Sequence, residues 1–207
     1  MERIVVYGQG GHSKVIQMMI QNLKNQHVSL IADDDSEKVN EVSAIRVIRA
    51  KQLVVYQQDF DSIIIAIGTN SIRKKVAEQY KGCPFATVID VTALVAEDAA
   101  IGIGTVVMPH SVIHPSVQVG KQSIINTGAI VEHDCKIDDY SHISPGAVLA
   151  GNVQIGKLVH VGANATILPE IVVGDNAIIG AGAVVTKNVT AGSIMVGNPA
   201  RQMGKEE

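Results

Sequence analysis

Residues 124–153 read IINTGA-IVEHDC-KIDDYS-HISPGA-VLAGNV, five consecutive segments of six residues. The second residue of each segment is aliphatic and the sixth is mostly small. The aliphatic position recurs without interruption from Ile89 to Val185, 17 times in all. A period of six with one large and one small inward position is typical of a triangular parallel β-helix, with one flat face per hexad. The sequence therefore predicts a β-helix over residues 89–189, with between five and six coils of three hexads.

The hexad IVEHDC contains three consecutive titratable residues, Glu132, His133 and Asp134. Because the aliphatic position and Cys135 point inward, we expect these three at the outer surface. Coils stack at the strand spacing of about 4.8 Å, so residues three hexads apart lie directly above one another. The residue above His133 is Gly151, which leaves the space over the imidazole without a side chain and exposes a backbone N–H.

Two interpretations of the surface histidine remain open. A carboxylate beside His133 raises the basicity of the imidazole and fixes its tautomer, as a general base requires. Alternatively, the acids only solvate a corner of the coil. His142 and His160 are also three hexads apart and should stack, and His142 is a candidate ligand contact. We interpret His110, His114 and His160 as ordinary surface or corner residues, and no spacing typical of a metal site accompanies them.

The first 84 residues have a different pattern, in which apolar strands alternate with amphipathic helices. Strands are expected at residues 3–8, 28–35, 44–48 and 62–68, and helices at 9–26, 51–58 and 70–80. This order predicts a small Rossmann-like parallel α/β sheet. We therefore divide the chain into an α/β domain over residues 1–84 and a β-helix domain over residues 85–207, with a linker near residues 81–86.

Gly10 and Gly11 follow the first expected strand and open a helix, where backbone N–H groups can approach a diphosphate. Asp33 and Asp34 end the second strand, near the place where a ribose-binding acid is expected. The dinucleotide fingerprint is incomplete, because Ser13 occupies its third glycine position. The alternative is an ordinary strand–helix turn. With so few strands, a single nucleotide is a better expectation than a dinucleotide.

Gly68 ends a further strand at the same carboxyl edge of the sheet, the edge where open α/β sheets bind ligands. His12, at the start of the first helix, can hydrogen-bond a phosphate or remain a solvated surface residue. Both are candidate substrate contacts.

The composition argues against several classes of protein. The formal net charge is −3 and no basic run is present, so no nucleic-acid partner is expected. No apolar stretch reaches the roughly 18 residues that span a bilayer. Cys83 and Cys135 form no paired motif, so a reducing cytoplasm is the expected compartment.

The whole chain resembles the bacterial nucleotide-sugar acetyltransferases of the bacillosamine pathway and their sialic acid O-acetyltransferase relatives. The resemblance rests on the motifs YGQGGH, LIADDD, AIGTNSIRKK, INTGAIVEHDCKI, SHISPGAVLAGNVQIG and VGNPAR. It implies a left-handed β-helix, acetyl-CoA as co-substrate without a metal, and a homotrimer with the donor groove between adjacent solenoids.

The resemblance also implies residue roles. His133 would be the catalytic base, Asp134 the acid that raises its basicity, and the N–H of Gly151 the oxyanion donor. The acetyl-CoA groove would be lined by His142, Ala163 and Ala181. The nucleotide-sugar would be held by Gly10, Gly11, His12, Asp33, Asp34 and Gly68.

The implied reaction is acetyl transfer to the 4-amine of a UDP-linked 4-amino-4,6-dideoxy-sugar, by direct attack in a ternary complex, in bacterial glycan or polysaccharide biosynthesis. One alternative is a sugar or sialic acid O-acetyltransferase, which would use the same base on a hydroxyl. A second is a non-catalytic trimeric scaffold with a nucleotide-sensing domain. A base aligned with Gly151 argues against the scaffold, because a scaffold needs neither group.

Overall fold

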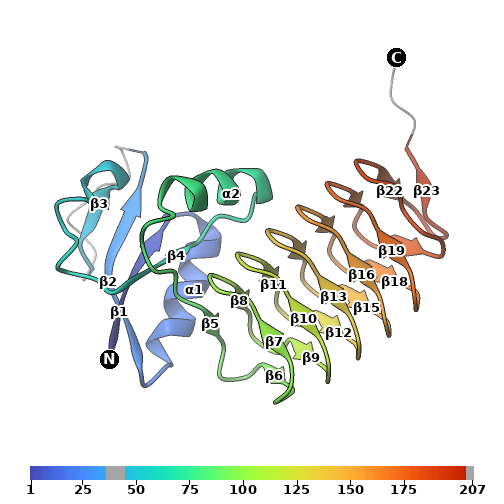
Figure 1. Ribbon diagram of the computed structural model, residues 1–207, viewed down its shortest axis with the longest axis horizontal. Coiled ribbons are helices and arrows are strands. Elements are labelled where there is room, and N and C mark those ends of the chain that lie inside the picture. The colour runs from blue at the N-terminus through green and yellow to red at the C-terminus, as the bar shows by residue number, and fades with distance from the viewer. Residues whose placement is uncertain (36–44, 204–207) are drawn as a thin grey trace.

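The structure is a computed structural model that describes residues 1–35 and 45–203. A small α/β unit lies at one end of a long solenoid, whose coils follow one another toward the C-terminus (Figure 1). Residue 44, the first of the strand expected at 44–48, lies outside the described residues. No helix in the described ranges has the length and apolar character needed to cross a membrane.

The α/β unit contains a four-stranded parallel sheet of order β3-β2-β1-β4. Its strands are β1 (Glu2–Tyr7), β2 (Gln26–Asp33), β3 (Val47–Arg49) and β4 (Ser62–Ile65), and its helices are α1 (Gly11–Gln21) and α2 (Asn70–Gln79). Because side chains alternate along a strand, Ile4 and Val6 pack toward α1, whereas Val5 and Tyr7 pack in the cluster that contains α2. Each face of the sheet is therefore covered by one helix.

The predicted helix over residues 51–58 is wrong. The chain forms a short 3-10 helix (Ala50–Gln52) followed by turns. Within residues 51–58 only Leu53 is buried, and Val54 and Val55 are largely exposed. A longer helix would have no continuous apolar stripe with which to pack.

The solenoid has three parallel faces, and its strands succeed one another around them. Face 1 contains β5 (Val88–Ile89), β8 (Val106–Val107), β11 (Ile124–Ile125), β14 (His142–Ile143), β17 (His160–Val161), β20 (Ile178–Ile179), β22 (Ile194–Val196) and the antiparallel β23 (Arg201–Gln202). Face 2 contains β6 (Leu94–Val95), β9 (Val112–Ile113), β12 (Ile130–Val131), β15 (Val148–Leu149), β18 (Thr166–Ile167) and β21 (Val184–Val185). Face 3 contains β7 (Ala100–Ile101), β10 (Gln118–Val119), β13 (Lys136–Ile137), β16 (Gln154–Ile155) and β19 (Val172–Val173).

The register confirms the predicted stacking. Ile125 pairs with Ile143, and Ile143 pairs with Val161, each one coil further on. The inward aliphatic residues form one continuous buried cluster, to which the small residues Ala129, Cys135 and similar positions belong. The parallel β-helix is thus built as the six-residue period predicts.

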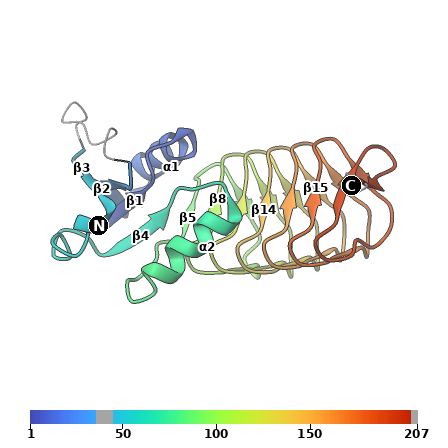
Figure 2. The ribbon, with the colours of Figure 1, turned by 90° about the horizontal axis from the view of Figure 1, so that it is seen from above.

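Face 1 changes character along the solenoid. Its outward residues on the first coils, Val88, Val106 and Ile124, are buried in a cluster shared with Ile16 and Ile20 of α1. Beyond the reach of α1, the next outward residues are histidines. The shared core joins the two units, and α2 lies along the side of the early coils (Figure 2). The later coils of face 1 therefore remain open beside the start of α2.

Candidate functional site

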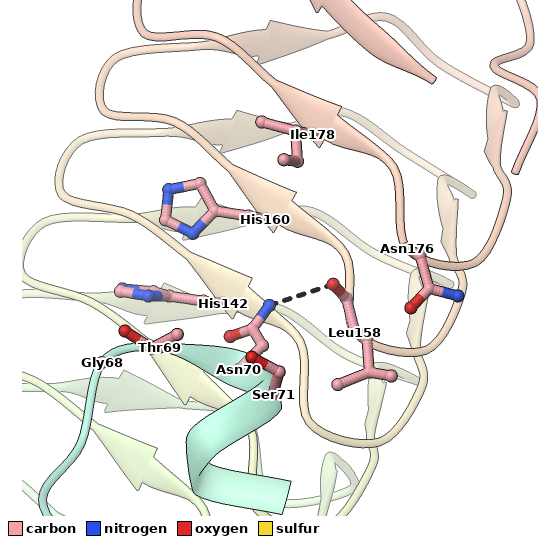
Figure 3. Close-up of a pocket in the computed structure, with 9 residues that line it drawn as sticks. All are labelled: Gly68, Thr69, Asn70, Ser71, His142, Leu158, His160, Asn176 and Ile178. Atoms are coloured by element: carbon pink, nitrogen blue, oxygen red, sulfur yellow. Dashed lines mark hydrogen bonds between the residues drawn. The ribbon is translucent and has the colours of Figure 1, made fainter. Parts of the chain in front are cut away.

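A pocket of about 500 Å³ lies where the α/β unit meets face 1 (Figure 3). One wall is the loop that leads into α2. The other wall is face 1, on which His142, His160 and Ile178 follow one another on successive strands. The lining consists of Gly68, Thr69, Asn70, Ser71, His142, Leu158, His160, Asn176 and Ile178. The structure thus brings together two residues predicted on separate domains, Gly68 and His142.

The two histidines of this pocket are paired in the register, as predicted. Their rings meet edge to face, with centroids 5.0 Å apart and an interplanar angle of 84°. The Asn126 side-chain amide lies 2.9 Å from Nε2 of His142. Side-chain contacts from the neighbouring coils therefore hold the buried His142 ring in place.

These imidazoles are neutral at physiological pH. Burial, together with the neighbouring His160 and the Arg73 guanidinium, lowers the pKa of His142 to about 3. Burial, together with Arg73, lowers the pKa of His12 to about 4. Neutral rings can donate or accept one hydrogen bond at each nitrogen, which suits contact with a polar ligand.

Acid is expected to destabilise the junction through these groups. The folded pKa of His142 lies below its ordinary value of 6.5, so between these values the unfolded chain binds a proton that the folded chain does not. The free energy of unfolding should therefore fall as pH drops from about 6.5 toward 3. Chemical unfolding at pH 7 and pH 5 should show a smaller loss in His142→Asn than in the parent protein, and identical losses would contradict this.

The turn between β1 and α1, which we call the glycine turn (residues 8–11), leaves open space at the start of α1. An added Cβ at Gly10 or Gly11 would meet no heavy atom within 4 Å, so a ligand has access to the start of α1. Gly8 has a φ of +110° and lies against the carbonyl oxygen of Ala66, which explains why glycine is needed there.

The two aspartates at the end of β2 have different roles. Asp33 is buried, and its carboxylate accepts from the backbone N–H of Gln9 (2.7 Å) and of Asp35 (2.9 Å). Asp34 is exposed and accepts only from the hydroxyl of Tyr7 (2.8 Å) among the described contacts. Asp33 therefore fixes the glycine turn, whereas Asp34 presents an oxygen toward solvent.

A second group lies on the edge between face 2 and face 3, which we call the 2–3 edge (residues 132–135 and their equivalents in other coils). Nδ1 of His133 is 2.7 Å from Oδ2 of Asp134, and both side chains are more than half exposed. Glu132 instead pairs with His114 of the preceding coil, at 3.6 Å. The three titratable residues thus belong to two separate pairs, and only Asp134 orients His133.

Gly151 lies directly against this imidazole. A Cβ at residue 151 would be 2.8 Å from Cε1 and from Nε2 of His133, so any larger residue would displace the ring. Within the described chain, no acceptor is bonded to the backbone N–H of Gly151. The arrangement provides a base and a free donor side by side, which suits proton removal and stabilisation of an oxyanion.

Ala163 and Ala181 lie on another edge, between face 1 and face 2, which we call the 1–2 edge. Their coils are directly stacked, since Gly182 N–H donates to the Ala163 carbonyl (2.8 Å). His133 and Ala163 are five hexads apart, which is not a multiple of three, so one chain must place them on different edges. A single chain therefore does not bring His133 into the pocket of His142.

Arg73 was missed by the sequence interpretation. It is 1% exposed and contacts both units. The available signal was its spacing, because Arg73, Val76 and Ala77 form the buried stripe of α2. Among the described residues, no group of three or more His, Cys, Asp or Glu could hold a metal ion.

Two family models match the chain. The PglD N-terminal domain matches residues 3–80, and the bacterial transferase hexapeptide repeat matches residues 116–151 and 152–187. A curated relative, the UDP-N-acetylbacillosamine N-acetyltransferase of Bacillus subtilis (strain 168), is 34% identical over 112 residues. That alignment covers 52% of this chain and 52% of the relative, about half the length of each.

Solved structures match over nearly the full length. The acetyltransferase domain of PglB from Neisseria gonorrhoeae FA1090 is 33% identical with a TM-score of 0.89, over 98% of this chain and 100% of that one. The same domain is known in complex with acetyl coenzyme A. PerB from Caulobacter crescentus, in complex with CoA and GDP-perosamine, is 29% identical with a TM-score of 0.91, over 97% of both chains.

Proposed function

The chain belongs to the bacterial hexapeptide-repeat sugar acetyltransferases that carry a PglD N-terminal domain, and from this membership we propose that it is an acetyl-CoA-dependent nucleotide-sugar N-acetyltransferase. The observation that carries the proposal is the His133–Asp134 pair beside the unbonded N–H of Gly151. A scaffold would need neither a base nor an adjacent free donor.

The mechanism follows from that geometry. The acceptor amine attacks the thioester carbonyl carbon of acetyl-CoA, and Nε2 of His133 takes the amine proton while Asp134 holds Nδ1. The Gly151 N–H donates to the oxyanion of the tetrahedral intermediate. Collapse breaks the carbon–sulfur bond, forms the amide and releases CoA as the thiolate. Cys135 is buried and burial raises its pKa to about 11, so an acetyl-cysteine intermediate has no support.

The acceptor that we propose is the 4-amine of a UDP-linked 4-amino-4,6-dideoxy-sugar. Gly10, Gly11 and Asp34 would hold its nucleotide, with His12 and Gly68 at the same sheet edge and Asp33 supporting the turn. Relatives named for UDP- and GDP-linked sugars both occur, and both are named as N-acetyltransferases. These names favour an amine over the hydroxyl of an O-acetyltransferase. Cys83 and Cys135 are both free thiols, which favours a reducing compartment, so we propose that the reaction takes place in the cytoplasm.

The test is a thiol-release assay with acetyl-CoA and a panel of UDP-, GDP-, CMP- and dTDP-linked sugars, each with an amine or a hydroxyl at C4. Thiol release from acetyl-CoA should require an amine at C4 of the sugar and should be fastest with the UDP-linked acceptor. Release that depends on a hydroxyl would indicate O-acetylation, and no release with any acceptor would overturn the proposal.

Asp34→Ala is expected to weaken nucleotide-sugar binding and leave acetyl-CoA binding unchanged. Its stability cost should be at most about 1 kcal/mol, because the exposed carboxylate accepts a single hydrogen bond, from the Tyr7 hydroxyl. Asp33→Ala should also lower the free energy of unfolding, by about 1–3 kcal/mol, since two backbone donors lose their acceptor. Calorimetric titration and thermal unfolding separate the two effects, with the exposed Asp59→Ala as control. Equal weakening of both ligands by Asp34→Ala would contradict the assignment.

We also propose a homotrimer, supported by the separation of the site within one chain. The base lies on the 2–3 edge, and the implied donor contacts Ala163 and Ala181 lie on the 1–2 edge, so adjacent solenoids must complete each groove. Mixing His133→Ala subunits with Ala181→Trp subunits, each weakly active alone, should restore activity. Failure of confirmed mixed trimers to recover activity would contradict a shared site.

A further inference from the structure

Resting on the proposed function, we propose that Arg73 and Asn70 form an interdomain clamp that positions the Gly68 loop (residues 67–71) over face 1, and so sets the acceptor site of the α/β unit against the donor site of the solenoid. Both are positioning residues. Neither is required to touch a substrate.

The guanidinium of Arg73 joins the two units through backbone carbonyls. On the α/β side, Nη1 donates to the carbonyls of Ile67 and Gly68, both at 3.0 Å. On the solenoid side, Nε donates to the Gln122 carbonyl (2.7 Å) and Nη2 to the Tyr140 carbonyl (2.8 Å). One rigid group therefore fixes the loop relative to two successive coils.

Asn70 completes the clamp. Its side-chain oxygen accepts from Nη2 of Arg73 (2.7 Å). Its Nδ2 donates to the carbonyls of Leu158 (3.1 Å) and Val159 (3.0 Å), one coil beyond Tyr140 (Figure 3 shows the Leu158 bond). The amide thus extends the attachment along the solenoid to the coil that supports the pocket.

The hydrogen bonds of the clamp fix the orientation of the loop on the solenoid more than they stabilise the junction. Arg73 is 1% exposed, and among the described residues every hydrogen-bond acceptor of its side chain is an uncharged carbonyl or amide oxygen. Burying a charge is costly, and apolar packing of the same volume is often more stable. A planar fork of five donors, however, specifies the direction of each acceptor, which a lysine or an apolar residue does not.

The clamped loop is the wall of the pocket. Gly68, Thr69, Asn70 and Ser71 line it opposite His142. A shift of about 1 Å in a positioning element costs on the order of 10²-fold in rate, because the reacting atoms leave their productive geometry. The clamp therefore governs productive placement of the acceptor. Of the implied acetyl-CoA contacts only His142 faces the loop, whereas Ala163 and Ala181 lie on the 1–2 edge.

The test compares Arg73→Lys and Asn70→Ala with Lys74→Ala, a control on the same helix whose charged side chain is 42% exposed. Both clamp variants should raise the KM for the nucleotide-sugar and lower kcat/KM by at least about tenfold. The upper end is the roughly 10²-fold loss expected for a shift of about 1 Å. The Kd for acetyl-CoA should change clearly less than the KM for the nucleotide-sugar, since of the implied donor contacts only His142 faces the loop. Unchanged acceptor kinetics in a folded clamp variant, or equal loss of both ligands, would overturn the proposal.

A readout without substrate separates this proposal from the proposed function. Arg73 lies close enough to lower the pKa of both His12 and His142. In Arg73→Met, NMR titration of the imidazoles should show both pKa values raised, whereas Lys74→Ala should not move them. Where Arg73→Met does not fold, Asn70→Ala should shift the same resonances because the guanidinium loses an acceptor. Unmoved resonances in folded variants would overturn the clamp, whatever the parent enzyme acetylates.

Discussion

His133→Ala is expected to lower kcat by about 10²- to 10⁴-fold, the usual contribution of a positioned general base. The imidazole contacts Gly151, next to the unbonded backbone donor, so its loss removes proton transfer at the reacting amine. The acetyl-CoA Kd should change little, because the ring is more than half exposed on an edge and supports no core packing. Steady-state kinetics at saturating substrates and calorimetric titration measure the two quantities.

The control is His114→Ala, which removes an imidazole from the same edge, one coil earlier, where it pairs with Glu132. It should keep kcat within a few-fold of the parent enzyme. Asp134→Asn should cost less than His133→Ala, because an amide still reaches Nδ1 but does not stabilise the imidazolium. Near-normal kcat in His133→Ala would place the base elsewhere and leave IVEHDC as a charged corner.

Leu149→Ala is expected to lower the free energy of unfolding by about 2–5 kcal/mol, the range for a fully buried leucine. Leu149 is 0% exposed and stacks between Val131 and Ile167 of the neighbouring coils. The repeating backbone is pinned by ladder hydrogen bonds on both sides, so it has little freedom to collapse into the cavity.

Leu94→Ala provides the same substitution at a site that is 66% exposed, and should change stability by less than about 0.5 kcal/mol. Denaturant unfolding at one fixed protein concentration makes the comparison valid for an oligomer. Equal losses at the two positions would contradict a core built from stacked aliphatic residues.

Much of the solenoid could be predicted because its period is a local property. The aliphatic residue of each hexad points inward, so the exposure of His133, the burial of Cys135 and the stacking of His142 on His160 followed from counting. The helix expected at residues 51–58 was wrong because only part of its apolar content is buried: Leu53 packs in the core, whereas Val54 and Val55 have no surface on which to pack. A pattern within a short segment does not report what lies beside it.

The positions of the candidate site residues on the solenoid edges could also be predicted only in part from the sequence. Counting hexads assigns His133 and Ala163 to different edges. Counting did not reveal that Glu132 pairs with His114 and leaves His133 to Asp134, because the choice depends on the side-chain geometry of two coils. Nor did it distinguish the buried Asp33, which holds the glycine turn, from the exposed Asp34.

By itself the sequence determined the coil, its inward and outward positions and the residues stacked above one another, because a repeat of six residues imposes all of these wherever the chain continues. Only the tertiary structure decided where the α/β unit docks, and hence that Gly68 and His142 share a pocket and that Arg73 ties one unit to the other. Docking depends on shape and hydrogen bonds between residues about 50 to 90 positions apart, such as Arg73 with Gln122 and Asn70 with Val159. No local period encodes such contacts.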